Sequence, residues 1–263
     1  MSSEHPFLNK KQLKKIDSTM QRILSRIGTD RKTMDEVFDT STLLSIEKLI
    51  SNRTIDYIDF PISTGKEGNV FLGITPQETS VAVKIFRIST ATFKHINQYL
   101  EGDPRFQSIH KSRRDITYAW TSKEWKNLQI LQDIGVRAPI PIKKNNNVLV
   151  MEFIGSDRQA APLLKNVDPQ DPKKIFSDII KMIEKMYVKA SLIHGDLSPY
   201  NILYYDHKPY LIDLGQGVLK EHPNADIFLR RDIHNIISYF NKYKNDADEQ
   251  EIYENITGKK WVR

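Results

Sequence analysis

The chain has 263 residues, of which 39% are hydrophobic and 27% are charged, and this globular composition excludes a disordered chain, a collagen and a coiled-coil rod. It contains no cysteine, which excludes a disulfide scaffold, a zinc ribbon and a thiol nucleophile. The net charge of +6 favours a polyanionic partner such as RNA or nucleotide phosphates, although a soluble basic protein without such a partner would carry the same charge.

The start of the chain predicts two helices. Apolar residues recur at spacings of three and four through residues 1–30, as on one face of a helix, and again between Leu43 and Ile50. Residues 29–40 contain few apolar residues and are typical of a connector. No apolar run approaches the length of a membrane span and the first residues have no apolar signal core, so we expect a cytoplasmic protein with no membrane partner.

A strand-rich region follows. The runs Val70–Gly73 and Ser80–Phe86 read as two strands of a hairpin, because the second alternates and is β-branched and a Thr-Pro segment separates them. Residues 88–118 are polar and basic and contain Gly-Asp-Pro, which predicts a long insertion that is mobile at its centre. A helix is expected from near Tyr118 to Leu131, with Gly135 as its stop.

The rest of the chain is mostly helical. After a strand over Val148–Ile154, Asp171 and Pro172 form a helix start, since Asp is a good cap and Pro fits the first turn. Two short strands, 201–205 and 210–213, precede a last amphipathic helix. We therefore predict an α+β fold with two lobes, a hinge near residues 151–155 and a helical extension. The predicted boundaries are 1–40 for the extension and connector, 41–263 for the main domain, about 41–150 for its N-lobe and about 155–263 for its C-lobe.

Four segments carry residues suited to chemistry. They are Ser63-Thr64-Gly65-Lys66-Glu67-Gly68-Asn69-Val70, Val81-Ala82-Val83-Lys84, His194-Gly195-Asp196-Leu197-Ser198-Pro199-Tyr200-Asn201, and Ile212-Asp213-Leu214-Gly215. Each is weak alone, but in this order they are the parts of a phosphoryl-transfer site. Such a site holds phosphates in line, neutralises them with a divalent cation and deprotonates the acceptor.

The individual roles follow from side-chain chemistry. Asp196 is placed to take a proton from an acceptor hydroxyl or water, and Asn201 and Asp213 supply the hard oxygen ligands that Mg²⁺ prefers. Lys84 lies in an apolar strand, where a cation needs anionic partners such as ATP phosphates and a helix carboxylate. Glu124 is the best candidate for that carboxylate, ahead of two other glutamates. The weaker candidates are Glu101 and Glu152.

These segments together resemble the RIO family of atypical serine kinases, whose fold is protein-kinase-like, over about residues 40–245. The phosphate loop is similar to that family's own signature, because Ser63 stands at the first glycine position of ordinary kinases while Gly65, Gly68 and Val70 match the rest. His222-Pro223-Asn224-Ala225 also resembles the family. The HGDLS spelling, the insertion with DPRFQ and the lack of a winged-helix domain favour the type 1 subfamily.

The resemblance implies an ATP site with Mg²⁺, or Mn²⁺ as an alternative. Its nucleotide contacts would come from the phosphate loop, in which Lys66 is either a phosphate ligand or a solvated charge, and from the hinge. The implied residues are Ser63, Gly65, Lys66, Gly68, Val70, Lys84, Glu124, Met151, Glu152 and Ile154. It further implies serine autophosphorylation in the insertion, with Ser108 and Ser112 as candidates, or ATP hydrolysis through an aspartyl-phosphate on Asp213. The implied partners, besides the protein itself, are the maturing small ribosomal subunit and its rRNA.

The sequence also departs from ordinary kinases. Gly195 replaces the arginine of H-R-D, only eight residues separate Asp213 from His222, and no A-P-E motif follows. The activation segment and the platform for peptide substrates are therefore expected to be missing. His194 is expected to brace the loop rather than to catalyse, and Trp120 to pack in the core.

Two other functions stay open from the residues. One is a small-molecule phosphotransferase of the kinase-like superfamily, as in aminoglycoside kinases, which also show H-G-D and a later I-D. The other is a factor that docks on pre-ribosomal RNA and uses ATP only as a conformational cue. The basic residues Lys111, Arg113 and Arg114 would contact rRNA in that case. The alternative is that they belong to an ordinary solvated loop that binds no RNA.

Overall fold

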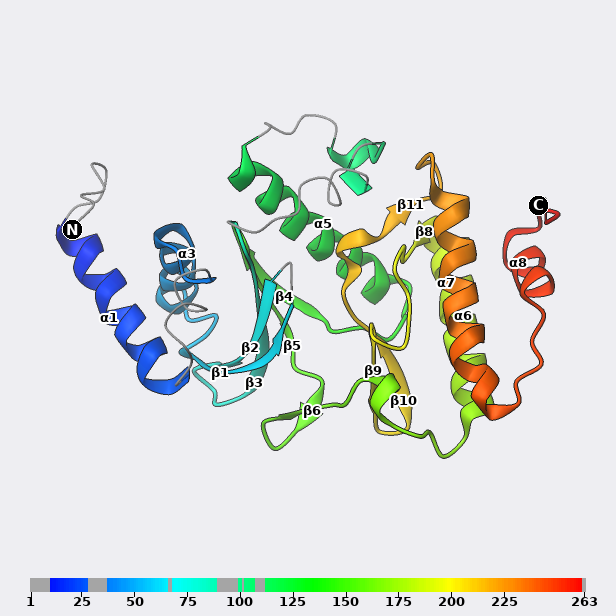
Figure 1. The fold of residues 1–263 in the computed structure, drawn as a ribbon. Helices are drawn as coiled ribbons and strands as arrows, with labels where there is room; N and C mark the ends of the chain where they lie inside the picture. The colour runs from blue at the N-terminus through cyan, green and yellow to red at the C-terminus, as the bar shows by residue number, and fades with distance from the viewer. Residues whose placement is uncertain are drawn as a thin grey trace. The chain divides into compact units, whose positions relative to one another are not determined.

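The computed structural model describes residues 10–27, 37–65, 68–88, 99–100, 102–106 and 112–261 (Figure 1). The chain forms two compact units. The first comprises Met1–Ala91 with Ile142–Phe153, and the second Thr92–Pro141 with Ile154–Arg263. The step from Phe153 to Ile154 falls within the predicted hinge. Among the described helices, none combines the length and apolarity that a membrane crossing needs.

The first unit is built on a five-stranded sheet with strand order β1-β2-β3-β5-β4. Its strands are β1 (Tyr57–Thr64), β2 (Gly68–Ile74), β3 (Ser80–Phe86), β4 (Pro141–Asn145) and β5 (Val148–Glu152). The predicted hairpin is confirmed: β2 and β3 pair antiparallel, and the amide of Thr75 donates to the carbonyl of Thr79 at 3.0 Å to close the turn. The sequence patterns did not indicate β1, which contains Pro61 and shifts register on both sides of it.

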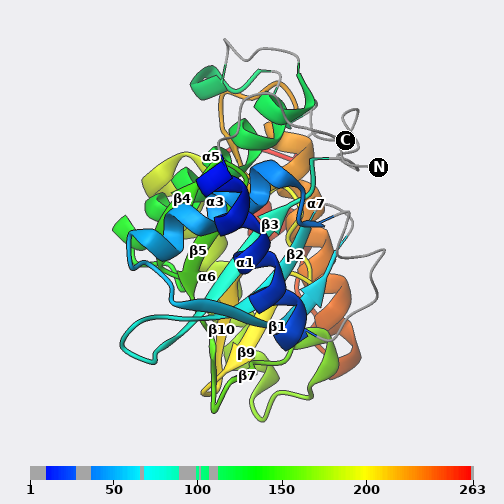
Figure 2. The ribbon, with the colours of Figure 1, turned by 90° about the vertical axis from the view of Figure 1, so that its left-hand side faces the viewer.

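Two helices, α1 (Lys10–Ile27) and α3 (Thr40–Ser51), complete the first unit and confirm the predicted pair. They pack on each other and on the sheet, as Figure 2 shows. Asp39 caps α3 by accepting from the amide of Thr42 at 2.7 Å. Ile16 and Ile23 of α1 belong to the same buried cluster as the sheet residue Val83, so the helical extension is part of this unit's core.

The second unit combines four helices with short strand pairs among the described residues. The helices are α5 (Arg113–Asp133), α6 (Pro172–Ala190), α7 (Ala225–Phe240) and α8 (Glu249–Thr257). The strand pairs are β6 (Gly155–Ser156) with β7 (Gln159–Ala160), β8 (Leu192–Ile193) with β11 (Val218–Leu219), and β9 (Ile202–Tyr205) with β10 (Lys208–Leu211). The short 3₁₀ turns are η1 (Pro104–Phe106), η2 (Leu164–Asn166), η3 (Leu214–Gln216) and η4 (Asn241–Tyr243).

Helix α6 packs on α7, α8, β8 and β10 in this unit. Asp171 caps it by accepting from the amide of Lys174 at 2.9 Å, and Pro172 is its first residue, which confirms the predicted start. Its apolar stripe is buried at Ile175, Ile179 and Met186. Helices α6 and α7 lie side by side, and α8 packs on both (Figure 1). The sequence analysis missed α8, which has only nine residues.

Helix α5 begins earlier than predicted. The prediction of a start near Tyr118 was wrong: the helix begins at Arg113, because the Ser112 hydroxyl caps it by accepting from the amide of Asp115 at 3.2 Å. It belongs to the second unit, although residues 41–150 were expected to form one lobe, since its buried face packs on η3. Most of the insertion, including Ser108, lies outside the described residues, so its predicted mobility stays a prediction.

Candidate active site

The phosphate loop joins β1 to β2 in the first unit. Ser63 on β1 stands opposite Val70 on β2, and the amide of Gly65 donates to the carbonyl of Gly68 at 2.9 Å. A Cβ on Gly68 would lie 2.4 Å from the carbonyl oxygen of Ile85, so only glycine fits there. Lys66 and Glu67 lie outside the described residues. The described ends of the loop, Gly65 and Gly68, are thus held together between paired strands.

Lys84 lies on β3 directly opposite Val70, the residue that ends the phosphate-loop motif. Its side chain is buried, and its ammonium lies 4.9 Å from the ring centroid of Phe86. The next strand in the sheet, β5, carries Met151 and Glu152 opposite Ala82 and Val81. The first unit therefore brings together the predicted phosphate loop, its lysine and two hinge residues.

Two predicted nucleotide-site residues belong to the second unit. Glu124 lies on α5 and is buried. Ile154 is also buried, and it is the residue at which the chain returns to the second unit within the predicted hinge. Because Glu124 and Lys84 belong to different units, their ion pair stays a prediction.

The second unit brings together Asp196, Asn201 and Asp213. The loop between β8 and β9 carries Asp196, whose carboxylate accepts from the amide nitrogen of Asn201 at 3.3 Å and from that of Gln216 at 3.2 Å. Asn201 also donates to the backbone carbonyl of Asp196 at 2.8 Å. Burial raises the pKa of Asp196, the Arg231 guanidinium lowers it, and the nearby Asp213 charge raises it. This carboxylate is half-buried and is held by two side-chain amides.

Asp213 follows β10 and begins the turn η3. The amide of Ile212 donates to the carbonyl of Asn201 at 3.0 Å, so the two predicted metal ligands lie on adjacent backbones. Asp213 adopts a left-handed backbone with φ 64 and ψ 61, a costly conformation for a residue with a Cβ. The described residues contain no cluster of three or more His, Cys, Asp or Glu side chains suited to a metal. One carboxylate and one amide oxygen nevertheless fit Mg²⁺, which takes few protein ligands and completes its shell with phosphate and water.

The sequence analysis missed Asp232, which binds the backbone of the loop that carries Asp196. We call this loop, residues 194–201 between β8 and β9, the base loop, after the role predicted for Asp196. Asp232 lies on α7, 1% exposed, and its two carboxylate oxygens accept from the amide of Gly195 at 2.8 Å and from that of Leu197 at 2.7 Å. These amides flank Asp196, so Asp232 fixes the backbone on both sides of Asp196. Burial raises the pKa of Asp232 to about 7, against the lowering effect of the two hydrogen bonds. The available signal was an aspartate on the apolar stripe of a helix, since such a residue is seldom buried without a partner.

The backbone at position 195 favours glycine over the arginine that ordinary kinases have there. Its φ is +80, and a Cβ there would lie 2.7 Å from the carbonyl oxygen of Gln216. The guanidinium of Arg231, on α7, donates to the carbonyl of Gly195 and, at 3.3 Å, to the hydroxyl of Tyr99. His194 is buried with its Nε2 3.1 Å from the carbonyl of Ile212, in agreement with the predicted bracing role.

The pH dependence of catalysis gives a first prediction. A base must lose its proton before it can act, so the rate rises as pH passes through the pKa of Asp196, which burial places above the ordinary 3.8. Since Arg231 lowers this pKa, we expect Arg231→Gln to move the acid limb of the autophosphorylation rate to higher pH. Arg230→Gln, one residue away with its guanidinium paired to Asp226, is the control and should leave the limb in place. An unchanged midpoint in Arg231→Gln would contradict Asp196 as the titrating group.

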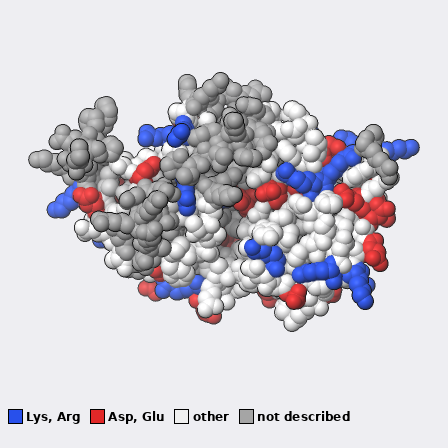
Figure 3. All heavy atoms as spheres, viewed as in Figure 1, with Lys and Arg blue, Asp and Glu red and all other residues white. Residues whose placement is uncertain are grey.

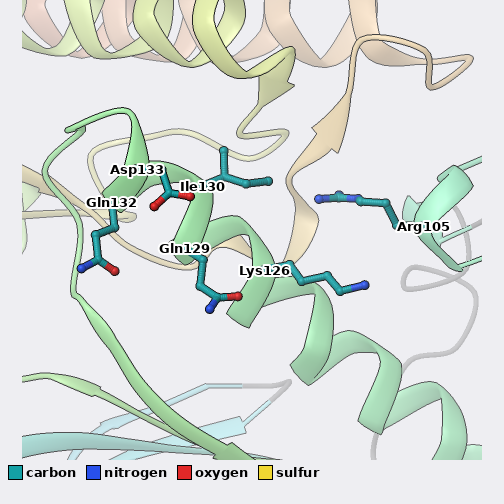
Figure 4. A pocket seen from close by; sticks show the side chains of 6 residues that line it. All are labelled: Arg105, Lys126, Gln129, Ile130, Gln132 and Asp133. Atoms are coloured by element: carbon teal, nitrogen blue, oxygen red, sulfur yellow. The ribbon is translucent and has the colours of Figure 1, made fainter.

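A separate hollow of about 370 Å³ lies on the outer face of α5 (Figure 4). Its lining residues are Arg105, Lys126, Gln129, Ile130, Gln132 and Asp133. None of them is a predicted site residue, so the hollow is not the proposed catalytic centre. The face drawn in Figure 3 carries side chains of both charges among the described residues, so it gives no support to a single basic surface for RNA.

A glycine-containing loop followed by a buried lysine, and an aspartate beside an asparagine and a second aspartate, are the parts expected of a protein-kinase-like phosphotransferase. The sequence model of the RIO domain matches residues 69–252. The chain belongs to the RIO family and, within it, to the Rio1 subfamily of atypical serine/threonine kinases.

Named relatives support the subfamily. The chain is 42% identical over 227 residues to the RIO-type serine/threonine-protein kinase Rio1 of Haloferax volcanii, covering 86% of this chain and 78% of that protein. For Rio1 of Methanocaldococcus jannaschii the identity is 39% over 231 residues, with coverages of 88% and 79%. The human serine/threonine-protein kinase RIO1 is 36% identical over 231 residues, and the match spans 86% of this chain but only 40% of the human protein.

Solved structures support the fold. The Rio2 kinase from Chaetomium thermophilum superposes with a TM-score of 0.68 at 22% sequence identity, covering 83% of this chain and 67% of that chain. A second structure of that kinase, a complex with ADP, Mg²⁺ and phosphoaspartate, gives a TM-score of 0.66 at 18% identity, with coverages of 96% and 87%. The predicted α+β, kinase-like fold is confirmed.

Proposed function

We propose that this RIO kinase uses ATP and Mg²⁺ to phosphorylate a serine of its own chain, with Asp196 as the base. The observation that carries this proposal is the carboxylate of Asp196, held by Asn201 and Gln216 on a loop whose backbone Asp232 fixes on both sides. A positioned carboxylate with a raised pKa is suited to accept the proton of a serine hydroxyl as it attacks phosphorus.

Asn201 and Asp213 would hold the cation. The amide nitrogen of Asn201 donates to Asp196, so its oxygen is the atom that a cation would take. Bound Mg²⁺ would neutralise charge on the phosphates, and Mn²⁺ could use the same oxygen ligands. In the first unit, Lys84 and the backbone between Gly65 and Gly68 would hold the phosphates.

The adenine base and the lysine partner are further parts of the proposal. The backbone of Glu152 and Ile154 would bind the edge of the base, with Met151 beside it. Glu124 would pair with Lys84, because both are buried charged residues and a buried charge needs a partner.

The proposed acceptors are Ser108 and Ser112 of the insertion. The hydroxyl of Ser112 caps α5 and donates to the carboxylate of Asp115 at 2.5 Å. Phosphorylation of Ser112 therefore requires this cap to open, and Ser108 lies outside the described residues.

The working role that we propose is in maturation of the small ribosomal subunit in the cytoplasm, with the pre-ribosomal particle and its rRNA as partners. Membership of the Rio1 subfamily and the net charge of +6 support this role. An ATPase that gives phosphate to water, or transiently to Asp213, is the second candidate, since the left-handed backbone of Asp213 is a strained feature of the kind found at reactive positions.

Single turnover with γ-labelled ATP and Mg²⁺ tests the proposal. We expect acid-stable label on serine in the wild type, and loss of that label in Asp213→Asn. Mostly free phosphate, with a small acid-labile fraction on protein, would favour the ATPase instead. If ATP binds but neither product forms, the protein is an ATP-gated binding factor, and label on an added small hydroxyl compound alone would identify a small-molecule kinase.

A further inference from the structure

A buried ionic cluster ties a short part of the insertion to helix α5 within the second unit. Asp103 is 1% exposed, and Lys123 on α5 is fully buried. The carboxylate of Asp103 accepts from the ammonium of Lys123 at 2.6 Å and from Arg105 at 2.7 and 2.9 Å. Burial raises the pKa of Asp103, but its bonds to Arg105 and Lys123 outweigh this and lower that pKa to about 2. A buried pair persists only when its polar atoms are paired in good geometry, as they are here.

The side chain of Arg105 also bonds toward the loop that carries Asp213. Its Nη1 donates to the side-chain oxygen of Asn127 at 2.8 Å. With its oxygen occupied, Asn127 directs its nitrogen to the carbonyls of Leu214 and Gly217, at 2.7 and 3.0 Å. These carbonyls lie at the two ends of η3. Because an amide can rotate by half a turn, the bond from Arg105 selects the orientation that binds the loop.

The same part of the insertion also reaches the base loop. Tyr99 is 5% exposed, with its ring centroid 6.1 Å from that of Trp120 and 5.1 Å from that of Phe228. Its hydroxyl accepts from Arg231, which also donates to the carbonyl of Gly195 beside Asp196. Tyr99 and Asp103–Arg105, which we call the insertion anchor, thus contact both loops of the proposed site through one intermediate side chain each.

We propose that the insertion anchor positions the catalytic loops, with Arg105 acting through Asn127 on Asp213 and Gln216, and Tyr99 acting through Arg231 on Asp196. Arg105 is then a positioning residue for phosphoryl transfer, and its role is not limited to holding the insertion in place. The inference rests on the proposed roles of Asp196 and Asp213. It makes the rate depend on how the insertion is held, because small displacements of reacting groups cost up to about 10²-fold in rate.

The kinetic test uses Arg105→Lys in the full chain. Lysine keeps a positive charge beside Asp103, but its single ammonium cannot bind Asp103 and Asn127 at once as the separate guanidinium nitrogens do. We expect kcat for ATP turnover to fall about 10–100-fold, with more Mg²⁺ needed for half the rate and little change in ATP affinity without metal. The matched control Arg230→Lys changes an arginine that pairs with Asp226 and should keep the wild-type kinetics.

A double-mutant cycle tests the path through Asn127. If Arg105 acts through Asn127, the kcat of Arg105→Lys combined with Asn127→Ala equals that of Asn127→Ala alone, because the second change removes what the first one orients. If the loss of kcat in the double variant equals the product of the losses in the two single variants, Arg105 does not act through Asn127. A wild-type kcat and Mg²⁺ dependence in Arg105→Lys would overturn the positioning role.

Hydrogen exchange separates failure of this inference from failure of the proposed function. The amide of Gly217 donates to the carbonyl of Leu214 at 3.1 Å, so its exchange reports the order of η3 without any turnover. We expect faster exchange at Gly217 in Arg105→Lys but not in Arg230→Lys. Faster exchange at Gly217 in Arg105→Lys, combined with no ATP turnover by the wild type, would support the path through Asn127 and contradict the proposed enzymatic activity. Wild-type exchange in Arg105→Lys would contradict that path, even if the wild type is an active kinase.

Discussion

Replacing Asp196 with Asn is expected to lower the single-turnover rate of serine phosphorylation by about 10²–10⁴-fold, the usual contribution of a positioned base. Asparagine preserves the size of the side chain and an oxygen that can accept from Asn201 and Gln216, but it cannot take a proton. ATP affinity should therefore stay near that of the wild type. The measurements are transfer of label from γ-labelled ATP and binding of a fluorescent ATP analogue.

Asp206→Asn is the matched control for this experiment. Asp206 lies in the turn between β9 and β10, exposed and paired with Lys208 at 3.0 Å, so the same chemical change there should leave the rate unaltered. A rate for Asp196→Asn within about threefold of the wild type, far below the expected effect of a base, would exclude Asp196 from that role.

Replacing Asp232 with Ala is expected to lower the free energy of unfolding by about 2–5 kcal/mol. The change leaves the amides of Gly195 and Leu197 buried without an acceptor, and each such group costs about 1–3 kcal/mol. Because these amides set the base loop, we also expect the rate to fall in the fraction that stays folded. Urea unfolding at pH 7, followed by fluorescence, measures the first effect.

Glu184→Ala on α6 is the comparison for Asp232→Ala. Glu184 is exposed, and substitutions of exposed surface residues usually change the free energy of unfolding little. If both variants lost equally little stability, the two bonds of Asp232 would not hold the base loop.

The proximity of the candidate site residues was predictable because the chain brings them together locally. Asp196 and Asn201 share one loop, and the β9–β10 hairpin returns the chain to Asn201 just before Asp213, so their proximity follows from short-range structure. The hairpin of β2 and β3 likewise places Lys84 opposite the end of the phosphate loop. These arrangements need no knowledge of how distant segments pack.

The supporting residues were hidden because their partners lie far along the chain. Asp232 binds amides 35 and 37 positions away, and Asn127 binds carbonyls 87 and 90 positions away. Lys123 has the residue type of a surface position, and its complete burial is accompanied by an ion pair with Asp103. In the same way, the start of α5 was misplaced because the basic residues after Ser112 are typical of a loop, whereas the cap decides where the helix begins.

The guanidinium that binds beside Asp196 comes from α7 and is permanently part of the chain. Arg231 donates to the carbonyl of Gly195, whereas the arginine of the ordinary H-R-D motif waits for a phosphate group on an activation loop. The fold itself therefore supplies the cation that binds the backbone beside Asp196, and no phosphate group takes part in this contact. If Asp196 is the base, we expect its loop to reach this arrangement without prior phosphorylation of an activation loop.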